Sequence, residues 1–268
     1  MDKGTVVGKG RSAEILSWED GRVLKLYKEG RPVAMAEREA LATEAAHQAG
    51  LPAPAVDGIV EVQGRQGIVL ERIEGPTMSA AVQREPWKLN RLARVMAELQ
   101  MRVHSCELPQ LPSLRERLAE RIQSVAALPA GTKEAVLAAL DQLPDGNVVC
   151  HGDLFVDNIM LSPRGPIIID WFSATRGNPL ADVAGSWLLN RLTPLRLGLP
   201  ERWVLDSMRA LFHWAYMRRY LQLSGASRRQ VKAWLLPVVA ARLDGDIPGE
   251  MQPFTQLIET LLAQQTSR

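Results

Sequence analysis

The 268-residue chain has little cysteine, no strong charge bias and no long apolar run. Its two cysteines, Cys106 and Cys150, are too few for a disulfide framework and lack a metal-binding CxxC spacing, so we expect both to be reduced. The net charge of +2 comes without the concentrated basic stripe of a nucleic-acid-binding protein. No run approaches the ~20 apolar residues of a membrane-spanning helix. The amino terminus, MDKGTVVGKGRS, lacks the apolar segment of a signal peptide. We therefore expect a soluble, cytoplasmic protein that binds neither nucleic acid nor membrane.

Residues 5–30 favour β structure in three short runs. The second and third runs are separated by Asp20-Gly21, which is typical of a hairpin turn. In the third run, the alternation of a strand places Lys25 on the same face as Tyr27. A lysine among apolar neighbours on a central strand needs an explanation.

One helix and two further strands follow this hairpin. The predicted ranges are 33–49 for the helix and 58–61 and 67–71 for the strands. Gly50 ends the helix, and the prolines that follow prevent it from continuing. The sequence thus predicts a small antiparallel β domain with one helix, spanning residues 1–74.

The rest of the chain is mainly helical, with hydrophobic residues at helical spacing. The predicted helices are 87–104, 114–128, 132–143, 180–193, 201–223, 227–242 and 252–265. Two short apolar strands, 147–150 and 167–169, flank a polar block. The expected fold class is therefore α+β, with a larger, mainly α-helical second domain over residues 75–268.

The polar block runs from His151 to Asn158 and reads HGDLFVDN, and Asp170 follows at the end of the next strand. Phosphoryl transfer needs such a set. Asp153 would orient an acceptor hydroxyl and take its proton, while Asn158 and Asp170 would offer hard oxygen ligands to Mg²⁺. A polar turn between two strands explains one such residue, but not this combination.

Upstream segments offer a phosphate-binding loop and a cation. The loop Gly8–Ala13 contains Gly10 and Ser12 and can bring backbone N–H groups close to phosphates, although alone it is more typical of an ordinary glycine-containing turn. Lys25 can bind phosphates and pair with a helix glutamate, although a lysine at a strand edge also reaches solvent in this way. The candidate glutamates are Glu37, Glu39 and Glu44.

The segment HGDLFVDNIM, followed by IIIDWFSATRGNPLAD, resembles the aminoglycoside phosphotransferase and choline kinase group, which are relatives of the protein kinases. The shared pattern is HGDxxxxN, a strand with a metal-binding Asp, and G-x-P-x-x-D. The segments GRSAEIL, RVLKLYK and EREA resemble the group's nucleotide loop, strand lysine and helix glutamate. The resemblance covers roughly residues 5–190 and implies a protein-kinase-like fold with two lobes.

The resemblance implies a role for each matching residue. It makes Asp153 the catalytic base, Asn158 and Asp170 the metal ligands, and Lys25 a phosphate-binding residue held by Glu39. The remaining positions are nucleotide contacts through the loop or the hinge between lobes: Gly10, Ser12, Glu71 and Ile73. By the same resemblance, Asp182 is a structural tether at a helix start and His151 holds the loop.

The chain departs from the protein kinases after Asp170. Trp171-Phe172 stands in place of Phe-Gly, no APE segment follows, and only a short connection leads to Pro179. There is little room for an activation loop, which favours a small-molecule acceptor. We expect a kinase that moves the γ-phosphate of ATP or GTP, with Mg²⁺, to a hydroxyl of an aminoglycoside or another hydroxylated antibiotic. The alternatives are a metabolic kinase for choline, a sugar or an amino-alcohol, an atypical protein kinase, and a non-catalytic nucleotide-binding protein.

The acceptor itself is less clearly indicated. Candidate acidic contacts are Asp157, Asp244, Asp246 and Glu250, although we favour surface charges and helix caps as the explanation of each. The helices from 191 to 232 are rich in arginine, which is not the lining that a tricationic antibiotic prefers. We expect a monomer or a weak homodimer.

Overall fold

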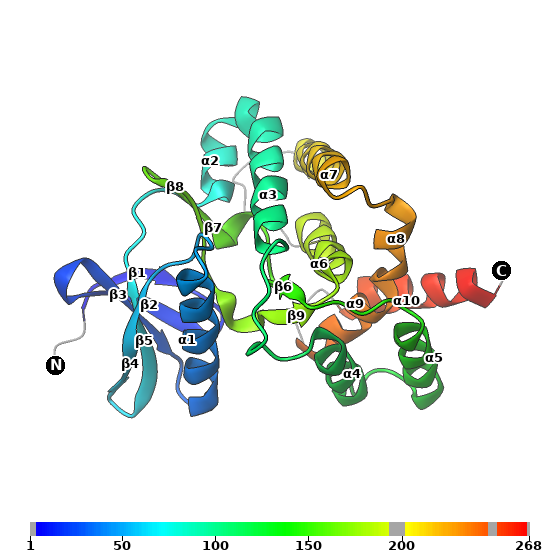
Figure 1. The fold of residues 1–268 in the computed structure, drawn as a ribbon, viewed down its shortest axis with the longest axis horizontal. Helices are drawn as coiled ribbons and strands as arrows, with labels where there is room; N and C mark the ends of the chain where they lie inside the picture. Colours follow the sequence, from blue (N-terminus) through cyan, green and yellow to red (C-terminus); the bar gives the residue numbers. More distant parts are fainter. Residues whose placement is uncertain (1–3, 193–201, 246–250, 267–268) are drawn as a thin grey trace. The chain divides into compact units, whose positions relative to one another are not determined.

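The computed structural model describes residues 4–192, 202–245 and 251–266 (Figure 1). Its contacts divide the chain into two compact units. The first comprises Met1–Ala81 with Val156–Ser173, and the second comprises Val82–Phe155 with Ala174–Arg268. A boundary between domains at residue 74 stays a prediction. The first unit is thus built from two separate stretches of sequence.

A five-stranded antiparallel sheet forms most of the first unit, in the order β1-β2-β3-β5-β4. The strands are β1 (Val6–Lys9), β2 (Ala13–Trp18), β3 (Arg22–Tyr27), β4 (Val56–Val62) and β5 (Arg65–Glu71), and helix α1 (Val33–Gln48) connects β3 to β4. The link between β2 and β3 is one 3₁₀ turn, Glu19–Gly21, in which Asp20 and Gly21 both have positive φ. The predicted Asp-Gly hairpin is therefore confirmed.

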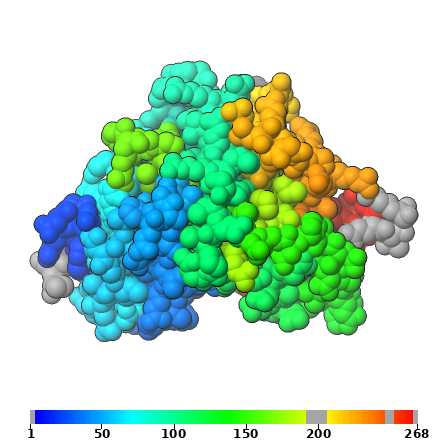
Figure 2. Space-filling view, viewed as in Figure 1, coloured from blue at the N-terminus to red at the C-terminus, as the bar shows by residue number. Residues whose placement is uncertain are grey.

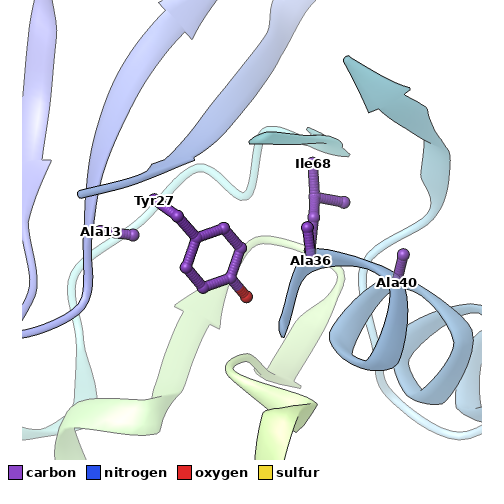
Figure 3. Packing of buried hydrophobic residues seen from close by; sticks show 5 residues of the cluster. All are labelled: Ala13, Tyr27, Ala36, Ala40 and Ile68. Atoms are coloured by element: carbon purple, nitrogen blue, oxygen red, sulfur yellow. The ribbon is translucent and has the colours of Figure 1, made fainter. Parts of the chain in front are cut away.

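The two faces of this sheet carry different side chains. Leu16, Leu24 and Leu26 pack together on one face. On the face that receives α1, the ring of Tyr27 lies between Ala13 of β2 and Ala36 of α1, with its hydroxyl directed toward the helix (Figure 3). This alternation along β3 puts Lys25 on the same side as Tyr27, as its sequence predicts.

A second, shorter hairpin completes the first unit. It consists of β7 (Ile159–Ser162) and β8 (Gly165–Ile168), preceded by the 3₁₀ turn Val156–Asn158 and followed by the 3₁₀ turn Trp171–Ser173. Backbone hydrogen bonds tie it to the amino-terminal stretch: the Ile168 N–H donates to Pro52 O at 2.7 Å, and the Leu161 N–H to Pro76 O at 2.8 Å. These bonds fix the segment that carries Asn158 and Asp170 to the five-stranded part of the unit.

The second unit is mainly helical. Its helices are α3 (Leu89–Val103), α4 (Leu114–Ser124), α5 (Ala130–Asp141), α6 (Pro179–Leu192), α7 (Arg202–Ser224), α8 (Arg228–Ala233), α9 (Leu235–Arg242) and α10 (Met251–Thr266), with 3₁₀ turns at Pro86–Lys88 and Leu243–Gly245. Helix α2 (Met78–Arg84) contains the point in the sequence, between Ala81 and Val82, where the first unit passes into the second. The side chains of α4 and α5 meet in the space-filling view, in green (Figure 2). None of the helices within the described ranges is both long enough and apolar enough to span a membrane.

Two strands bring distant parts of the second unit together. β6 (Val148–Cys150) pairs antiparallel with β9 (Thr175–Gly177). β6 leads directly into the loop that starts at His151, and β9 leads into α6, whose first turn contains Asp182. The pairing puts Cys150 opposite Thr175, and hydrogen bonds from the His151 and Gly152 N–H groups to Asp182 bring the loop to the first turn of α6.

Some predicted elements differ from the observed ones. The helix predicted at 227–242 is broken at Trp234, because Pro237 lacks an N–H and its ring excludes a regular helical turn four residues earlier. The helix predicted at 114–128 ends at Ser124, with Val125 in an extended conformation. Three short elements, α2, β7 and β9, had no clear periodicity in the sequence.

Candidate functional site

The buried amine of Lys25 is paired with the helix α1 carboxylate of Glu39. Lys25 Nζ lies 2.6 Å from Glu39 Oε1, and the two side chains are only 13% and 2% exposed. The hydroxyl of Tyr27 donates to the other carboxylate oxygen, Oε2. Glu37 and Glu44 lie on the exposed side of α1. Of the three candidate glutamates, the structure brings Glu39 to the lysine.

Opposing effects set the charges in this group. Burial by itself lowers the pKa of Lys25, but the carboxylates of Glu39 and Asp170 outweigh it and raise the pKa overall, so the amine stays protonated. Burial raises the pKa of Glu39, and the Lys25 ammonium acts against that rise. Burial and the charge of Glu39 raise the pKa of Tyr27, so its hydroxyl remains a donor. The result is a fixed cation on the face of the sheet that packs against α1.

Asp170 approaches the same cation from the other stretch of the first unit. Its Oδ1 lies 2.9 Å from Lys25 Nζ, and its side chain is 42% exposed. Its backbone has φ of +66°, a left-handed conformation that aspartate adopts more easily than most residues. The Ile169 N–H donates to the Asn158 carbonyl at 2.9 Å, which holds the backbones beside Asn158 and Asp170 next to each other.

The oxygen atoms of Asn158 and Asp170 suit a hard cation. No group of three or more His, Cys, Asp or Glu side chains gathers as a metal cage in the described part of the chain. Mg²⁺ does not need such a cage, because it keeps waters and substrate phosphates among its ligands and takes one or two oxygens from the protein. The residues present therefore fit Mg²⁺ shared with a nucleotide.

The remaining nucleotide-binding candidates lie in the same unit. The Gly10 N–H donates to Ala13 O at 2.8 Å, and Ser12 O accepts from the Lys28 N–H at 2.9 Å, so the loop is a closed turn. The Glu71 N–H donates to Ala55 O at 2.9 Å, and its carboxylate pairs with Arg164. A contact from the Glu71 backbone to a base would thus use its carbonyl. The nucleotide-binding roles of Gly10, Ser12, Glu71 and Ile73 stay predictions.

In the second unit, Asp182 holds the loop that precedes Asp153. Its Oδ1 accepts the Gly152 N–H at 2.6 Å, and its Oδ2 accepts the His151 N–H at 3.2 Å. His151 Nδ1 in turn accepts the Asp153 N–H at 3.3 Å. Asp182 and His151 therefore have the tethering and loop-holding positions that the resemblance implies.

A buried polar network supports Asp182 from α3 and α7. His104 Nε2 and Gln100 Nε2 each lie 3.0 Å from Asp182 Oδ2, and Tyr220 shares a 2.7 Å hydrogen bond with His104 Nδ1. Burial alone would raise the pKa of Asp182, but its hydrogen bonds and the nearby histidines lower it. This network was not predicted from the sequence. Its signal is the i, i+4 pair Gln100 and His104 on the otherwise apolar face of a helix.

Asp153 itself contacts a cation that the sequence analysis also missed. Its Oδ1 lies 3.3 Å from Nη1 of Arg242, at the end of α9. Asp244 pairs with Arg121 of α4, with Nε–Oδ2 at 3.6 Å, and Asp157 accepts a hydrogen bond from Ser79 in the first unit. These contacts account for two of the four candidate acidic residues. Asp246 and Glu250, like Arg196, lie outside the described residues.

Comparisons with known proteins identify the family and the fold. A family model described as the phosphotransferase enzyme family matches residues 3–222. An aminoglycoside-3′-phosphotransferase of type VIII superposes with a TM-score of 0.62 at 20% identity, covering 90% of this chain and 93% of that one. No curated protein sequence matches the chain.

Two further solved structures are similar in fold. One is a thermostable mutant of the aminoglycoside phosphotransferase APH(4)-Ia in a ternary complex with ADP and hygromycin B (TM-score 0.66, 16% identity, 98% of this chain and 92% of that one). The other is a choline/ethanolamine kinase family protein from Mesorhizobium loti (TM-score 0.57, 19% identity, 97% and 86%). The predicted resemblance and the α+β, kinase-like fold are confirmed.

Proposed function

The chain belongs to the phosphotransferase enzyme family and is a phosphotransferase, as predicted, and we propose that it transfers the γ-phosphate of ATP or GTP to a hydroxyl of a small molecule. The observation that carries the proposal is the buried Lys25, paired with Glu39 and with Asp170. A protonated lysine held by a helix glutamate beside a metal-ligating aspartate is the arrangement that phosphoryl transfer needs.

Asp153 is the proposed catalytic base. Its carboxylate accepts the proton of the acceptor hydroxyl as the acceptor oxygen bonds to the γ-phosphorus. The bond from that phosphorus to the β–γ bridging oxygen breaks, and the nucleoside diphosphate leaves. Asp182 keeps the loop in place through the His151 and Gly152 N–H groups, so the base is oriented before the acceptor binds.

Lys25, Asn158 and Asp170 are proposed to act on the nucleotide. Lys25 would bind phosphate oxygens, with Glu39 holding its amine in one position. Asn158 and Asp170 would hold Mg²⁺, which neutralises the charge on the phosphates when it is bound. Gly10 and Ser12 would contact the phosphates, and the backbones of Glu71 and Ile73 would contact the base.

The proposed phosphate acceptor is a broad class of small hydroxylated molecules and not one compound. Two of the structures similar in fold are aminoglycoside phosphotransferases and one is a choline/ethanolamine kinase family protein. These relatives support testing aminoglycosides and other hydroxylated antibiotics first, and choline, sugars and amino-alcohols second. The short connection after Asp170 argues against a protein acceptor. A cytoplasmic location and a monomer or weak homodimer stay predictions.

A coupled nucleotide-turnover screen tests the proposal. Purified protein with Mg²⁺ and ATP or GTP is offered each acceptor class, and the phosphorylated product is identified by mass spectrometry. We expect Asp153→Asn to reduce transfer at least ~100-fold while nucleotide binding is retained. Asp141→Asn, at the carboxyl end of α5, is the matched control and should turn over like the wild type. Wild-type turnover by Asp153→Asn, or no turnover with any acceptor, would contradict the proposal.

A further inference from the structure

Four charged side chains, one of which is the proposed base Asp153, form a cluster within the second unit. Arg242 Nη1 lies 3.3 Å from Asp153 Oδ1, and both side chains are about a quarter exposed, 22% and 26%. Arg121 pairs with Asp244, which also accepts a 2.5 Å hydrogen bond from the Ser124 hydroxyl. Helix α4, which carries Arg121 and Ser124, packs against α9 and the turn that follows it. The packing of these helices therefore holds the four side chains of the cluster near one another.

The two arginines in this cluster interact electrostatically. Burial lowers the pKa of Arg121, the charge of Arg242 lowers it further, and the charges of Asp244 and Asp153 act in the opposite direction. Arg121 thus lies close enough to interact electrostatically with both Asp153 and Arg242.

The guanidinium of Arg121 also has N–H donors that the contact with Asp244 does not use. Among the described residues, its contact with a carboxylate is from Nε to Asp244 Oδ2 at 3.6 Å, and its two terminal amino groups donate no hydrogen bond. Its side chain is 34% exposed, so part of it is accessible to a ligand. A guanidinium presents such donors in a fork that matches a carboxylate or a phosphate.

The charges around Asp153 change when an acceptor binds. The acceptor hydroxyl must hydrogen-bond to Asp153, whose Oδ1 already faces Arg242. When Asp153 takes the hydroxyl proton, it loses the negative charge that faces Arg242 and acts on Arg121. A negative group on the acceptor replaces that charge, whereas an ammonium group adds positive charge beside the two arginines.

We propose that Arg121 and Arg242 form an anion subsite beside Asp153, so that the acceptor is a hydroxylated compound bearing a carboxylate or a phosphate. This assignment rests on the proposed function and narrows its acceptor class. It places Arg121 as the main anion contact and Arg242 as a residue that moves from Asp153 to the acceptor. A polycationic aminoglycoside is a poor acceptor at such a site.

Matched charge series test the subsite. The probes are gluconate, glucose 1-phosphate, glucose and glucosamine, together with glycerate and glycerol, each added to the wild type with Mg²⁺ and the preferred nucleotide. We expect kcat/KM for the anionic members to exceed that of the neutral member about 100-fold, mainly through KM, and to exceed that of glucosamine further. Comparing gluconate with glucose 1-phosphate separates a carboxylate from a phosphate requirement.

Variants of the two arginines test whether these residues cause the preference for anionic acceptors. Arg121→Gln should lower the ratio of kcat/KM between anionic and neutral acceptors at least ~10-fold, and Arg121→Lys should restore part of it. Arg242→Gln should lower the same ratio. Arg229→Gln, an exposed arginine on α8, is the control and should leave it unchanged. A general loss of folding would lower both rates and leave the ratio intact, which would count against the subsite.

The outcomes separate this inference from the proposed function. If a neutral or cationic acceptor is preferred and Asp153→Asn abolishes its phosphorylation, the phosphotransferase assignment stands and the anion subsite is wrong. If the only acceptor found in the wider screen lacks a carboxylate or phosphate, the subsite is likewise overturned. If no acceptor of any charge is phosphorylated, the proposed function fails and the subsite fails with it.

Discussion

Lys25 Nζ lies 2.9 Å from Asp170 Oδ1, although the two residues are 145 positions apart. The contact joins β3 to the short segment between β8 and the 3₁₀ turn Trp171–Ser173. Since Asp170 is also the proposed metal ligand, its carboxylate would have to be shared between the lysine and Mg²⁺ when a nucleotide binds. Nucleotide binding should therefore loosen this pair while Glu39 continues to hold the amine.

Replacing Lys25 separates its structural role from its proposed chemical role. Lys25→Met leaves the Glu39 carboxylate buried without its cation, so we expect the free energy of unfolding to fall by about 3–5 kcal/mol. The double variant Lys25→Met/Glu39→Gln should recover most of that loss but no turnover. Chemical denaturation and a turnover assay measure the two effects. Recovery of turnover in the double variant would exclude Lys25 from phosphate binding.

Tyr27 is expected to position Glu39. Tyr27→Phe removes the hydroxyl that donates to Oε2 of Glu39 but keeps the ring in the core cluster. We expect a loss of about 1.5–3 kcal/mol in the free energy of unfolding, because the bond involves a buried charged group. The nucleotide KM should rise more than kcat falls, since the effect reaches the phosphates only through Lys25. An unchanged nucleotide KM would limit Tyr27 to packing.

Acid should destabilise the protein through Asp182. Its pKa in the folded protein is lowered, so the stability it contributes is present above the unfolded pKa of about 3.9 and is lost as the pH falls below that value. Asp182→Asn should therefore cost about 3 kcal/mol at neutral pH. The difference from the wild type should shrink as the pH falls below about 4. Urea unfolding at several pH values measures this, and a difference that does not vary with pH would be inconsistent with a charged Asp182.

Gly75 is expected to resist substitution. It has φ of +128°, and a Cβ atom there would overlap the carbonyl oxygen of Leu161 in β7. Gly75→Ala should cost at least ~2 kcal/mol in the free energy of unfolding, because both strain and steric overlap oppose it. Gly131→Ala, at a helical position with no atom within 4 Å, should be neutral or slightly stabilising. Equal melting temperatures for the two variants would contradict the packing of β7 beside Gly75.

The two thiols should differ in reactivity. Cys150 is fully buried before the HGD loop, and burial raises its pKa well above the ordinary value, whereas Cys106 is half-buried. In the native protein a thiol reagent should modify Cys106 first, and Cys150 should react only after unfolding. Mass spectrometry of the labelled peptides measures the order. Early labelling of Cys150 would mean that β6 opens readily.

Much of this arrangement could be predicted from local pattern. The alternation along β3 identified the face of Lys25, and the order of HGDLFVDN and Asp170 indicated the chemistry. Elements whose stability depends on tertiary pairing were harder to predict. β9 is three residues long, too short to show a periodicity in its sequence, and its strand conformation depends on pairing with β6 and on the backbone contacts of Arg176 with Pro112 and Ser113.

The α1 glutamates show what the resemblance added. Local pattern alone left Glu37, Glu39 and Glu44 open, the resemblance selected Glu39, and the position of Glu39 on the helix brings it to Lys25. Arg242 was beyond prediction because it is 89 positions from Asp153 and lies in a helix that begins after an unpredicted break. Long-range partners of this kind depend on the packing of whole helices.

The two-part construction of the first unit has a consequence for synthesis on the ribosome. The segment that carries its β7–β8 hairpin follows the amino-terminal stretch after the residues Val82–Phe155, about 75 positions, which at ~5–20 residues per second are translated in ~4–15 s. During that interval the growing chain carries Lys25 and Glu39 without Asp170, and the carbonyls of Pro52 and Pro76 lack their partners. The first unit therefore cannot be completed until the β7–β8 hairpin has been synthesised. A chaperone would be most useful during this interval.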